Sequence, residues 1–146
     1  MGLEEFMKMK EHGIRTDCYW AVLGKFQKLY PDAHFECVMR HPYSVGWNNV
    51  PPGILSPSAS LLTAAKSKTY SMCFATYARN LFLELFGNPK AVERMQFLNI
   101  LAKKQLVFLV CVEKNPSQCH RSLLKTWMDD LENFIQFYKQ EQEKLK

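Results

Sequence analysis

The stretch LVFLVCVEKNPSQCHRSLL, residues 106–124, carries the clearest fold signal in the sequence. Residues 106–112 form a short and continuous apolar run, which is typical of a central strand in a parallel sheet covered on both faces. Asn115-Pro116-Ser117 then predicts a turn, and the pattern beyond it predicts a helix from Cys119 to about residue 143. A buried strand, a loop and a helix in this order are the repeating unit of an α/β fold.

The other elements predicted from the sequence agree with this fold class. Strands are expected at residues 13–20 and 34–40, and helices at residues 3–11, 21–30, 59–66, 74–87 and 88–102. Ser56-Pro57 supplies an N-cap and a proline for the first helical position, while Gly87 and Asn88-Pro89 separate two helices. We therefore predict a single α/β domain over residues 1–146 with a small, mainly parallel sheet flanked by helices.

The composition is that of a soluble globular protein, with the cytoplasm as the expected location. No run approaches the about 18 apolar residues of a membrane span, and the N-terminal stretch lacks the apolar core of a signal peptide. The five cysteines are odd in number and form no CxxC pair, so free thiols are expected. No metal site is expected, because Cys119 and His120 are adjacent and neighbouring residues rarely both bind one tetrahedral ion. No cofactor is expected either.

Charge and hydropathy limit the partners of the protein. The net charge of +5 is dispersed, with Lys103-Lys104 as the densest cluster, and no basic run is interleaved with aromatic residues. This charge suits an anionic small ligand as well as a nucleic acid, and no membrane partner is expected. The C-terminal helix carries an apolar stripe that either packs on the core or forms a homodimer interface, consisting of Leu131, Phe134, Ile135, Phe137 and Tyr138.

The loop and the helix start after residue 112 form the candidate site. In an open parallel sheet, ligands bind beyond the carboxyl ends of the strands, and a helix N-terminus offers unpaired N–H groups and a partial positive charge. Arg121 either binds two oxygens of an anion there or pairs with Glu113. The same positive field favours a reactive thiolate at Cys119, which is otherwise a small, partly buried residue.

Three neighbouring side chains carry further alternatives. His120 is a candidate general acid or base, or a ligand contact, and otherwise caps the helix or packs. Glu113 is a candidate base, a ribose ligand or the structural partner of Arg121. Lys114 either contacts phosphate or is a solvated loop residue. The candidate catalytic residues are therefore Cys119, His120 and Glu113.

Several well-known catalytic motifs do not occur in the sequence. A cysteine-phosphatase loop starting at Cys111 would need an arginine at position 117, which is Ser117, and Arg121 lies ten positions beyond Cys111. The glycine-rich phosphate loops, the nucleophile elbow GxSxG and the zinc motif HExxH do not occur either. The common nucleotide enzymes and hydrolases are therefore disfavoured.

The segment from Cys111 to Leu124 reads C-x-E-x-x-P-x-x-C-H-R-x-L-L, and this pattern resembles the C-terminal signature of the DUF488 family. Val38-Met39-Arg40-His41-Pro42 resembles the family's second strand, although Val38 stands where the family commonly has Asp. Leu55-Ser56-Pro57-Ser58 resembles its loop-to-helix segment, and Tyr77 its recurrent tyrosine. The resemblance covers roughly residues 14–130. It implies an α/β, Rossmann-like three-layer fold and supplies no reaction.

In this implied fold, Arg40 and Arg121 would face the same edge of the sheet, with residues 41–56 covering it. Phosphate oxygens are then expected on the two arginines and a nucleobase on an aromatic ring. The aromatic candidates are Trp47, Tyr19 and Trp20, and the last two otherwise fill the core. The candidate ligand contacts are Arg121, Arg40, Lys114, Trp47, Tyr19, Ser56 and Tyr77.

Three functions are compatible with the sequence. The first is binding, without turnover, of a nucleotide or related phosphorylated metabolite at the strand-loop-helix element of residues 106–124. The second is an enzyme that acts on such a ligand, with Cys119 or Glu113 as nucleophile or base together with His120. The third is nucleic-acid binding through the dispersed positive surface.

Overall fold

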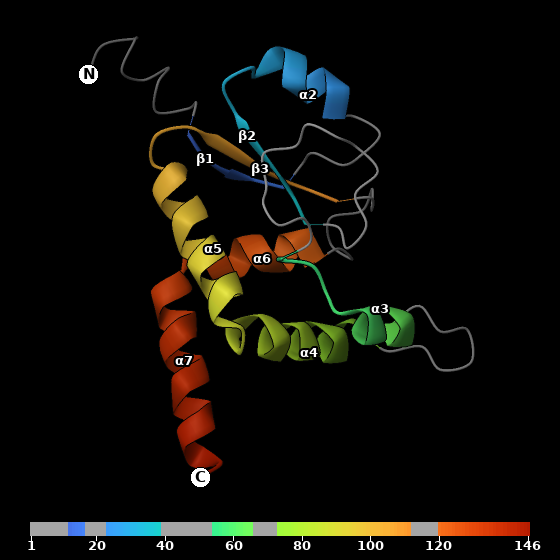
Figure 1. The fold of residues 1–146 in the computed structure, drawn as a ribbon, viewed down its shortest axis with the longest axis vertical. Helices are drawn as coiled ribbons and strands as arrows, with labels where there is room; N and C mark the ends of the chain where they lie inside the picture. Colours follow the sequence, from blue (N-terminus) through green and yellow to red (C-terminus); the bar gives the residue numbers. More distant parts are fainter. Residues whose placement is uncertain (1–11, 17–22, 39–53, 66–72, 112–119) are drawn as a thin grey trace.

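The computed structural model describes residues 12–16, 23–38, 54–65, 73–111 and 120–146. Strands and helices alternate along much of the chain, and three helices follow one another in the middle (Figure 1). The predicted α/β class is confirmed, while the predicted helix at 3–11 lies outside the described residues. In chain order the elements are β1 (Gly13–Arg15), α2 (Leu23–Leu29), β2 (His34–Cys37), α3 (Ala59–Ala65), α4 (Phe74–Phe86), α5 (Pro89–Leu101), β3 (Leu106–Val110), α6 (His120–Asp129) and α7 (Leu131–Lys144).

β3 is the central strand of a three-stranded parallel sheet with the order β1-β3-β2. Gly13 pairs with Leu106 on one side of it, and His34 pairs with Val107 on the other. Every residue of β3 is buried, which confirms the central position predicted from its continuous apolar run. Parallel strands need long crossover connections, and the one from β2 to β3 contains α3, α4 and α5.

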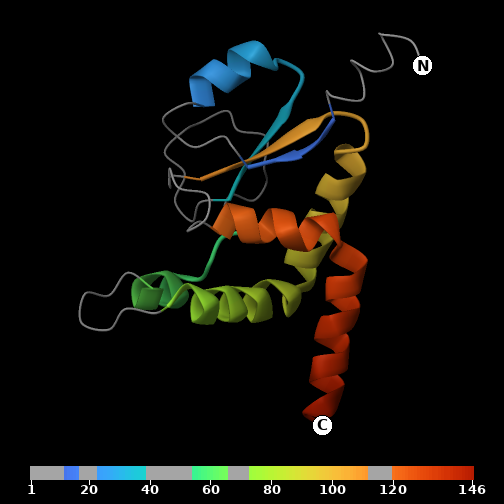
Figure 2. The ribbon, with the colours of Figure 1, turned by 180° about the vertical axis from the view of Figure 1, so that it is seen from behind.

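The side chains of β3 alternate between two hydrophobic clusters, one on each face of the sheet. Val107 and Leu109 belong to the larger cluster, to which α4, α5, α6 and α7 contribute. Leu106, Phe108 and Val110 belong to the smaller cluster, which α2 covers. Figures 1 and 2 show α2 on one face of the sheet and α5 and α6 on the other. The small parallel sheet is therefore flanked by helices on both faces, as predicted.

At the junction of α4 and α5, the predicted role of Asn88 is confirmed and the predicted role of Gly87 is not. The Asn88 side chain caps α5 by accepting a backbone hydrogen bond, as Asn88-Pro89 predicts. Gly87 has a φ of −82°, so it does not end α4 in a left-handed conformation. A Cβ at Gly87 would lie 2.8 Å from the carbonyl oxygen of Leu83 and 2.9 Å from the hydroxyl of Tyr138. The Leu83 carbonyl of α4 and the Tyr138 hydroxyl of α7 together leave no room for a side chain at this position.

α3 begins after Ser58, and the prediction of Ser56 as its N-cap is wrong. The Ser58 hydroxyl accepts a hydrogen bond from the N–H of Leu61 at 3.1 Å, which is the N-cap contact of a helix. Glu84 of α4 in turn accepts hydrogen bonds from the N–H and the hydroxyl of Ser58. A carboxylate 26 residues away thus stabilises the cap.

The single helix predicted from residue 119 to about residue 143 is also wrong, because two helices occupy its described part. α6 ends at Asp129 and α7 begins at Leu131. Asp130 between them has φ −139° and ψ 43°, which lies outside the helical region. The break turns the chain, and Figure 1 shows α7 leading away from the sheet.

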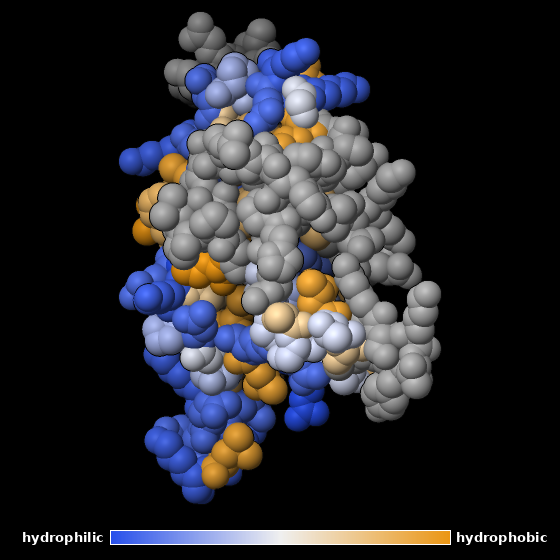
Figure 3. Space-filling model, turned by 45° about the vertical axis from the view of Figure 1, so that its right-hand side comes forward, coloured by the Kyte–Doolittle hydropathy of each residue, from blue (hydrophilic) through white to orange (hydrophobic). Residues whose placement is uncertain are grey.

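The apolar stripe of α7 is largely used inside the molecule. Leu131 and Ile135 are buried, Phe134 and Tyr138 pack against the larger cluster, and Phe137 is 50% exposed. Because α7 contacts α4 and α6, core packing accounts for most of the stripe. Figure 3 shows hydrophobic residues of the visible face in separate groups among hydrophilic ones. No helix in the described part of the chain is long and apolar enough to cross a bilayer.

Candidate functional site

The carboxyl ends of β2 and β3 meet the start of α6. Val38 extends the pairing beyond β2, because its N–H donates to the carbonyl oxygen of Val110 at 3.0 Å. On the neighbouring strand, β3 is followed by Cys111, and α6 starts at His120. This edge of an open parallel sheet is where ligands of α/β proteins bind.

His120 is buried and joins both strand ends. Its Nε2 is hydrogen-bonded to the carbonyl oxygen of Val38, and its Nδ1 lies 3.8 Å from the Sγ of Cys111. A carbonyl oxygen can only accept, so Nε2 must carry the proton of the first bond. In the neutral ring, Nδ1 is then the acceptor that faces the thiol.

The guanidinium of Arg121 lies beside the same strand end. Arg121 is among the largest fully buried side chains, with 1% of the residue exposed. Its Nη1 donates a hydrogen bond to the carbonyl oxygen of Cys111 at 3.4 Å. A cation in this position raises the local positive potential, and the partial charge at the N-terminus of α6 adds to it.

The structure thus brings two predicted site residues, His120 and Arg121, to the ends of β2 and β3. Two others are in the described part: Ser56 is buried ahead of α3, and Tyr77 packs in the larger cluster with its ring centroid 6.1 Å from that of Phe74. The remaining predicted site residues lie outside the described residues, and these are Cys119, Glu113, Lys114, Arg40, Trp47 and Tyr19.

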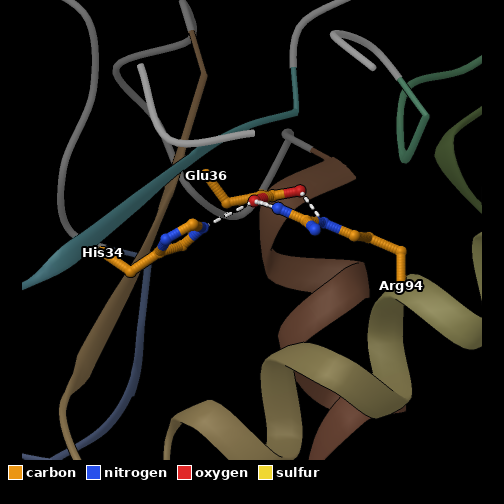
Figure 4. A network of polar contacts seen from close by, with 3 residues as sticks. All are labelled: His34, Glu36 and Arg94. Atoms are coloured by element: carbon orange, nitrogen blue, oxygen red, sulfur yellow. Dashed lines mark hydrogen bonds and ion pairs between the residues drawn. The ribbon is translucent and has the colours of Figure 1, made fainter. Parts of the chain in front are cut away.

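A buried ion network lies on β2, two residues before Val38. Glu36 is fully buried and accepts a hydrogen bond from Nε2 of His34 at 2.7 Å. Arg94 of α5 donates two more, from Nε at 2.8 Å and from Nη2 at 2.7 Å. Figure 4 shows His34 and Arg94 approaching the carboxylate from opposite sides.

Opposing effects act on the pKa of Glu36. Burial raises this pKa, whereas the hydrogen bonds and charges of Arg94 and His34 lower it, and the net result lies below the ordinary value of 4.5. The hydrogen bond to Glu36 in turn raises the pKa of Arg94. The ion pair between Glu36 and Arg94 links β2 to α5. Because Val38 follows on the same strand, the network also supports the carbonyl that His120 contacts.

Cys111, Glu36 and Arg94 are not among the site residues predicted from the sequence. A signal existed for Cys111, because it is the first residue of the C-x-E-x-x-P-x-x-C-H-R pattern. No pattern of neighbouring residues predicts the pairing of Glu36 with Arg94, because the two are 58 residues apart in the sequence. Within the described ranges, no three His, Cys, Asp or Glu side chains are grouped so that they could hold a metal ion.

Comparison with protein-family models gives a match over more than half of the chain. The family model DUF488-N3a, described as the active DUF488-N3 subclade, matches residues 38–132. These residues make up more than half of the chain and include Val38, Cys111, His120 and Arg121. No curated protein and no solved structure gives a significant match. The comparison therefore supplies a family, without a ligand or a reaction.

Proposed function

The chain belongs to the DUF488 family, within the DUF488-N3a subclade, and from this premise we propose that it binds an anionic small ligand. The ligand is a nucleotide or a related phosphorylated metabolite, and the site is the strand-loop-helix element of residues 106–124. Its phosphate lies beside the carboxyl end of β3 and the first turn of α6. The sheet supplies a fixed frame for this turn, because His120 contacts both Val38 and Cys111.

The observation that carries this proposal is the guanidinium of Arg121 at the carboxyl edge of the sheet. Its contact with the carbonyl oxygen of Cys111 places it at the end of the central strand. A guanidinium matches two oxygens of a phosphate in a planar, bidentate geometry, which a lysine cannot reproduce. The edge itself is the usual ligand position in open parallel sheets.

Electrostatics also favour an anion at this place. α6 has ten residues and no acidic residue in its first turn, so the partial positive charge at its N-terminus is not neutralised from within the helix. The chain as a whole carries a net charge of +5, which attracts anions from solution. A phosphate would therefore meet backbone N–H groups and a guanidinium together.

Ligand binding is tested by thermal shift and calorimetry with a panel of nucleotides, dinucleotides and nucleotide sugars. We expect at least one class to stabilise the wild-type protein. Arg121→Lys, which keeps the charge and loses the planar fork, should weaken its affinity roughly 10- to 100-fold. Arg79→Lys, at an exposed position of α4, is the matched control and should bind like wild type. A panel without any shift, or equal affinities of both variants, would overturn the proposal.

A second candidate function is an enzyme that acts on the same ligand. The contact between the thiol of Cys111 and the imidazole of His120 favours it, as does the description of the matching subclade as active. Mass spectrometry of each ligand after incubation separates the two functions. A product decides for the enzyme, and bound but unchanged ligand decides for the binding protein.

We also infer a cytoplasmic location from an exposed thiol. Cys73 is an exposed free thiol, and free thiols are usual in a reducing compartment. Cell fractionation with thiol labelling measures this directly. We expect the protein in the cytoplasmic fraction with the Cys73 thiol reduced, and recovery from an oxidising compartment would contradict the inference.

A further inference from the structure

We infer that Cys111 is a nucleophile, that His120 is its general base, and that the carbonyl oxygen of Val38 orients this base. The inference rests on the proposed function, because its substrate is the anionic ligand held beside Arg121. It assigns the nucleophile to the end of β3, whereas the sequence pattern offers Cys119, next to His120, as the candidate thiol. The substrate class is a phosphorylated compound with an electrophilic carbon that carries a leaving group.

The geometry has the three parts that nucleophilic catalysis by a thiol requires. A nucleophile and a base lie within hydrogen-bond reach, since Sγ of Cys111 is 3.8 Å from Nδ1 of His120. A third group holds the base, since the Val38 carbonyl accepts the hydrogen bond of Nε2. The carbonyl fixes the tautomer, so that Nδ1 has its lone pair toward the thiol. Nucleophile, base and orienting group in sequence are the diagnostic arrangement of activated nucleophiles.

The charges around Cys111 favour the thiolate. Burial alone favours the neutral thiol, and Cys111 is only 2% exposed. Transfer of the proton to His120 leaves the pair neutral as a whole, so the burial penalty is smaller than for an isolated thiolate. Arg121 adds a positive charge through its contact with the carbonyl of Cys111 itself, and the N-terminus of α6 adds a partial one.

The chemical step conserves atoms and charge with water as the co-reactant. The proton of Cys111 moves from Sγ to Nδ1 of His120, and the sulfur lone pair forms a bond to the electrophilic carbon. The bond from this carbon to the leaving group breaks, and the leaving group takes its electron pair and the proton from Nδ1. Water then gives a proton to Nδ1 and attacks the same carbon. The C–S bond breaks, and the sulfur regains the proton from Nδ1.

The test measures the reactivity of each thiol in the full-length protein. Iodoacetamide labelling is followed by peptide mass spectrometry at about pH 6, where an ordinary thiol is almost wholly protonated. We expect Cys111 to react roughly 100-fold faster than Cys37, a control thiol that is buried to a similar extent at 1%. His120→Gln should remove this difference. The background variant Cys73→Ser removes the exposed thiol from competition.

A second measurement does not depend on reagent access. The ultraviolet absorbance of the thiolate is compared between wild type and Cys111→Ser at about pH 6, and we expect the signal in wild type alone. Equal absorbance together with equal labelling of Cys111 and Cys37 would overturn the inference. The proposed function is tested separately by the thermal shift with ligand. If Arg121→Lys weakens this shift and Cys111 is unreactive, ligand binding is supported and the nucleophile is rejected. A reactive Cys111 without any ligand shift rejects the proposed ligand and supports the thiol–imidazole pair.

Discussion

Glu36 and Arg94 are joined by two hydrogen bonds, of 2.8 and 2.7 Å, between the middle of β2 and the first half of α5. The carboxylate is fully buried, and 16% of the Arg94 side chain is exposed. His34 completes the set of donors at 2.7 Å. Among the strands of the described residues, β2 pairs with β3 alone, so this ion pair supplements the hydrogen bonds between these two strands.

Removal of the guanidinium should destabilise the fold strongly. Arg94→Ala leaves the buried carboxylate of Glu36 without its counterion, and such a change costs about 3–5 kcal/mol in the free energy of unfolding. Urea denaturation measures the loss. Lys90→Ala, which removes an exposed cation from the same helix, should change the free energy by less than about 0.5 kcal/mol. Equal effects of the two substitutions would show that the ion pair contributes nothing specific.

The contribution of Glu36 should depend on pH in a defined direction. Its pKa is lower in the folded protein, so the stabilisation is fully present above the ordinary value of 4.5 and is lost as the pH falls toward the lower folded value. We expect the stability difference between wild type and Glu36→Gln to shrink as the pH falls from neutral to acidic values below 4.5. Denaturation over this range measures it, with the exposed carboxylate variant Glu132→Gln as the control. A difference that grows on acidification would contradict the prediction.

A methyl group at Gly87 should clash with the backbone of α4 and with the Tyr138 side chain of α7. Gly87→Ala places a Cβ 2.8 Å from the carbonyl oxygen of Leu83 and 2.9 Å from the hydroxyl of Tyr138. Because a backbone atom cannot move aside easily, we expect a loss of about 1–3 kcal/mol in thermal or urea unfolding. Gly24→Ala is the matched control, because its Cβ meets nothing within 4 Å. The control should be neutral or stabilising, and a similar loss in both variants would contradict the steric explanation.

The C-terminal stripe should not form a dimer. Leu131 and Ile135 are buried within the chain, which leaves Phe137, at 50% exposure, as the most exposed member of the stripe. A stable interface needs far more apolar area than one half-exposed ring offers. Sedimentation of wild type and Phe137→Ser should therefore give the same monomeric mass. A dimer in wild type that the substitution dissociates would restore the homodimer interpretation.

Salt should distinguish a small ligand from a nucleic acid. A nucleotide that contacts the site through one or two phosphates should lose affinity with a log–log slope of about −1 to −2, whereas a polynucleotide that covers the dispersed charges would give a slope several times steeper. Titrations of one nucleotide and one oligonucleotide at rising salt concentration measure both slopes. Tighter oligonucleotide binding with the steep slope would favour the nucleic-acid function.

Local sequence signals predict α5 and β3 closely. Asn88-Pro89 predicts a helix at residues 88–102, and the structure has it at Pro89–Leu101. The uninterrupted apolar run predicts a central strand at residues 106–112, and the structure has it at Leu106–Val110. In both places the residues that determine the element are neighbours in the chain, so the sequence pattern contains the physical cause.

Features that depend on distant residues are not predictable in this way. Glu84 stabilises the cap at Ser58 from another helix, and the break at Asp130 lies in a segment without Gly or Pro, where apolar periodicity continues. The candidate site could be predicted only in part. The pattern after β3 locates it, but the contact of His120 with Val38 involves a backbone oxygen of another strand, which no side-chain pattern reports.

The strand order β1-β3-β2 has a consequence for the growing polypeptide. β1 and β2 leave the ribosome before β3. They do not pair with each other in the folded sheet, because β3 lies between them. Until residues 106–110 are made, the nascent chain carries two strands without their native partner. Such long-range parallel pairing forms slowly, and unpaired strands are prone to aggregate. A ribosome-bound chain that ends before residue 106 should therefore depend on chaperones, and this dependence should fall once β3 has emerged.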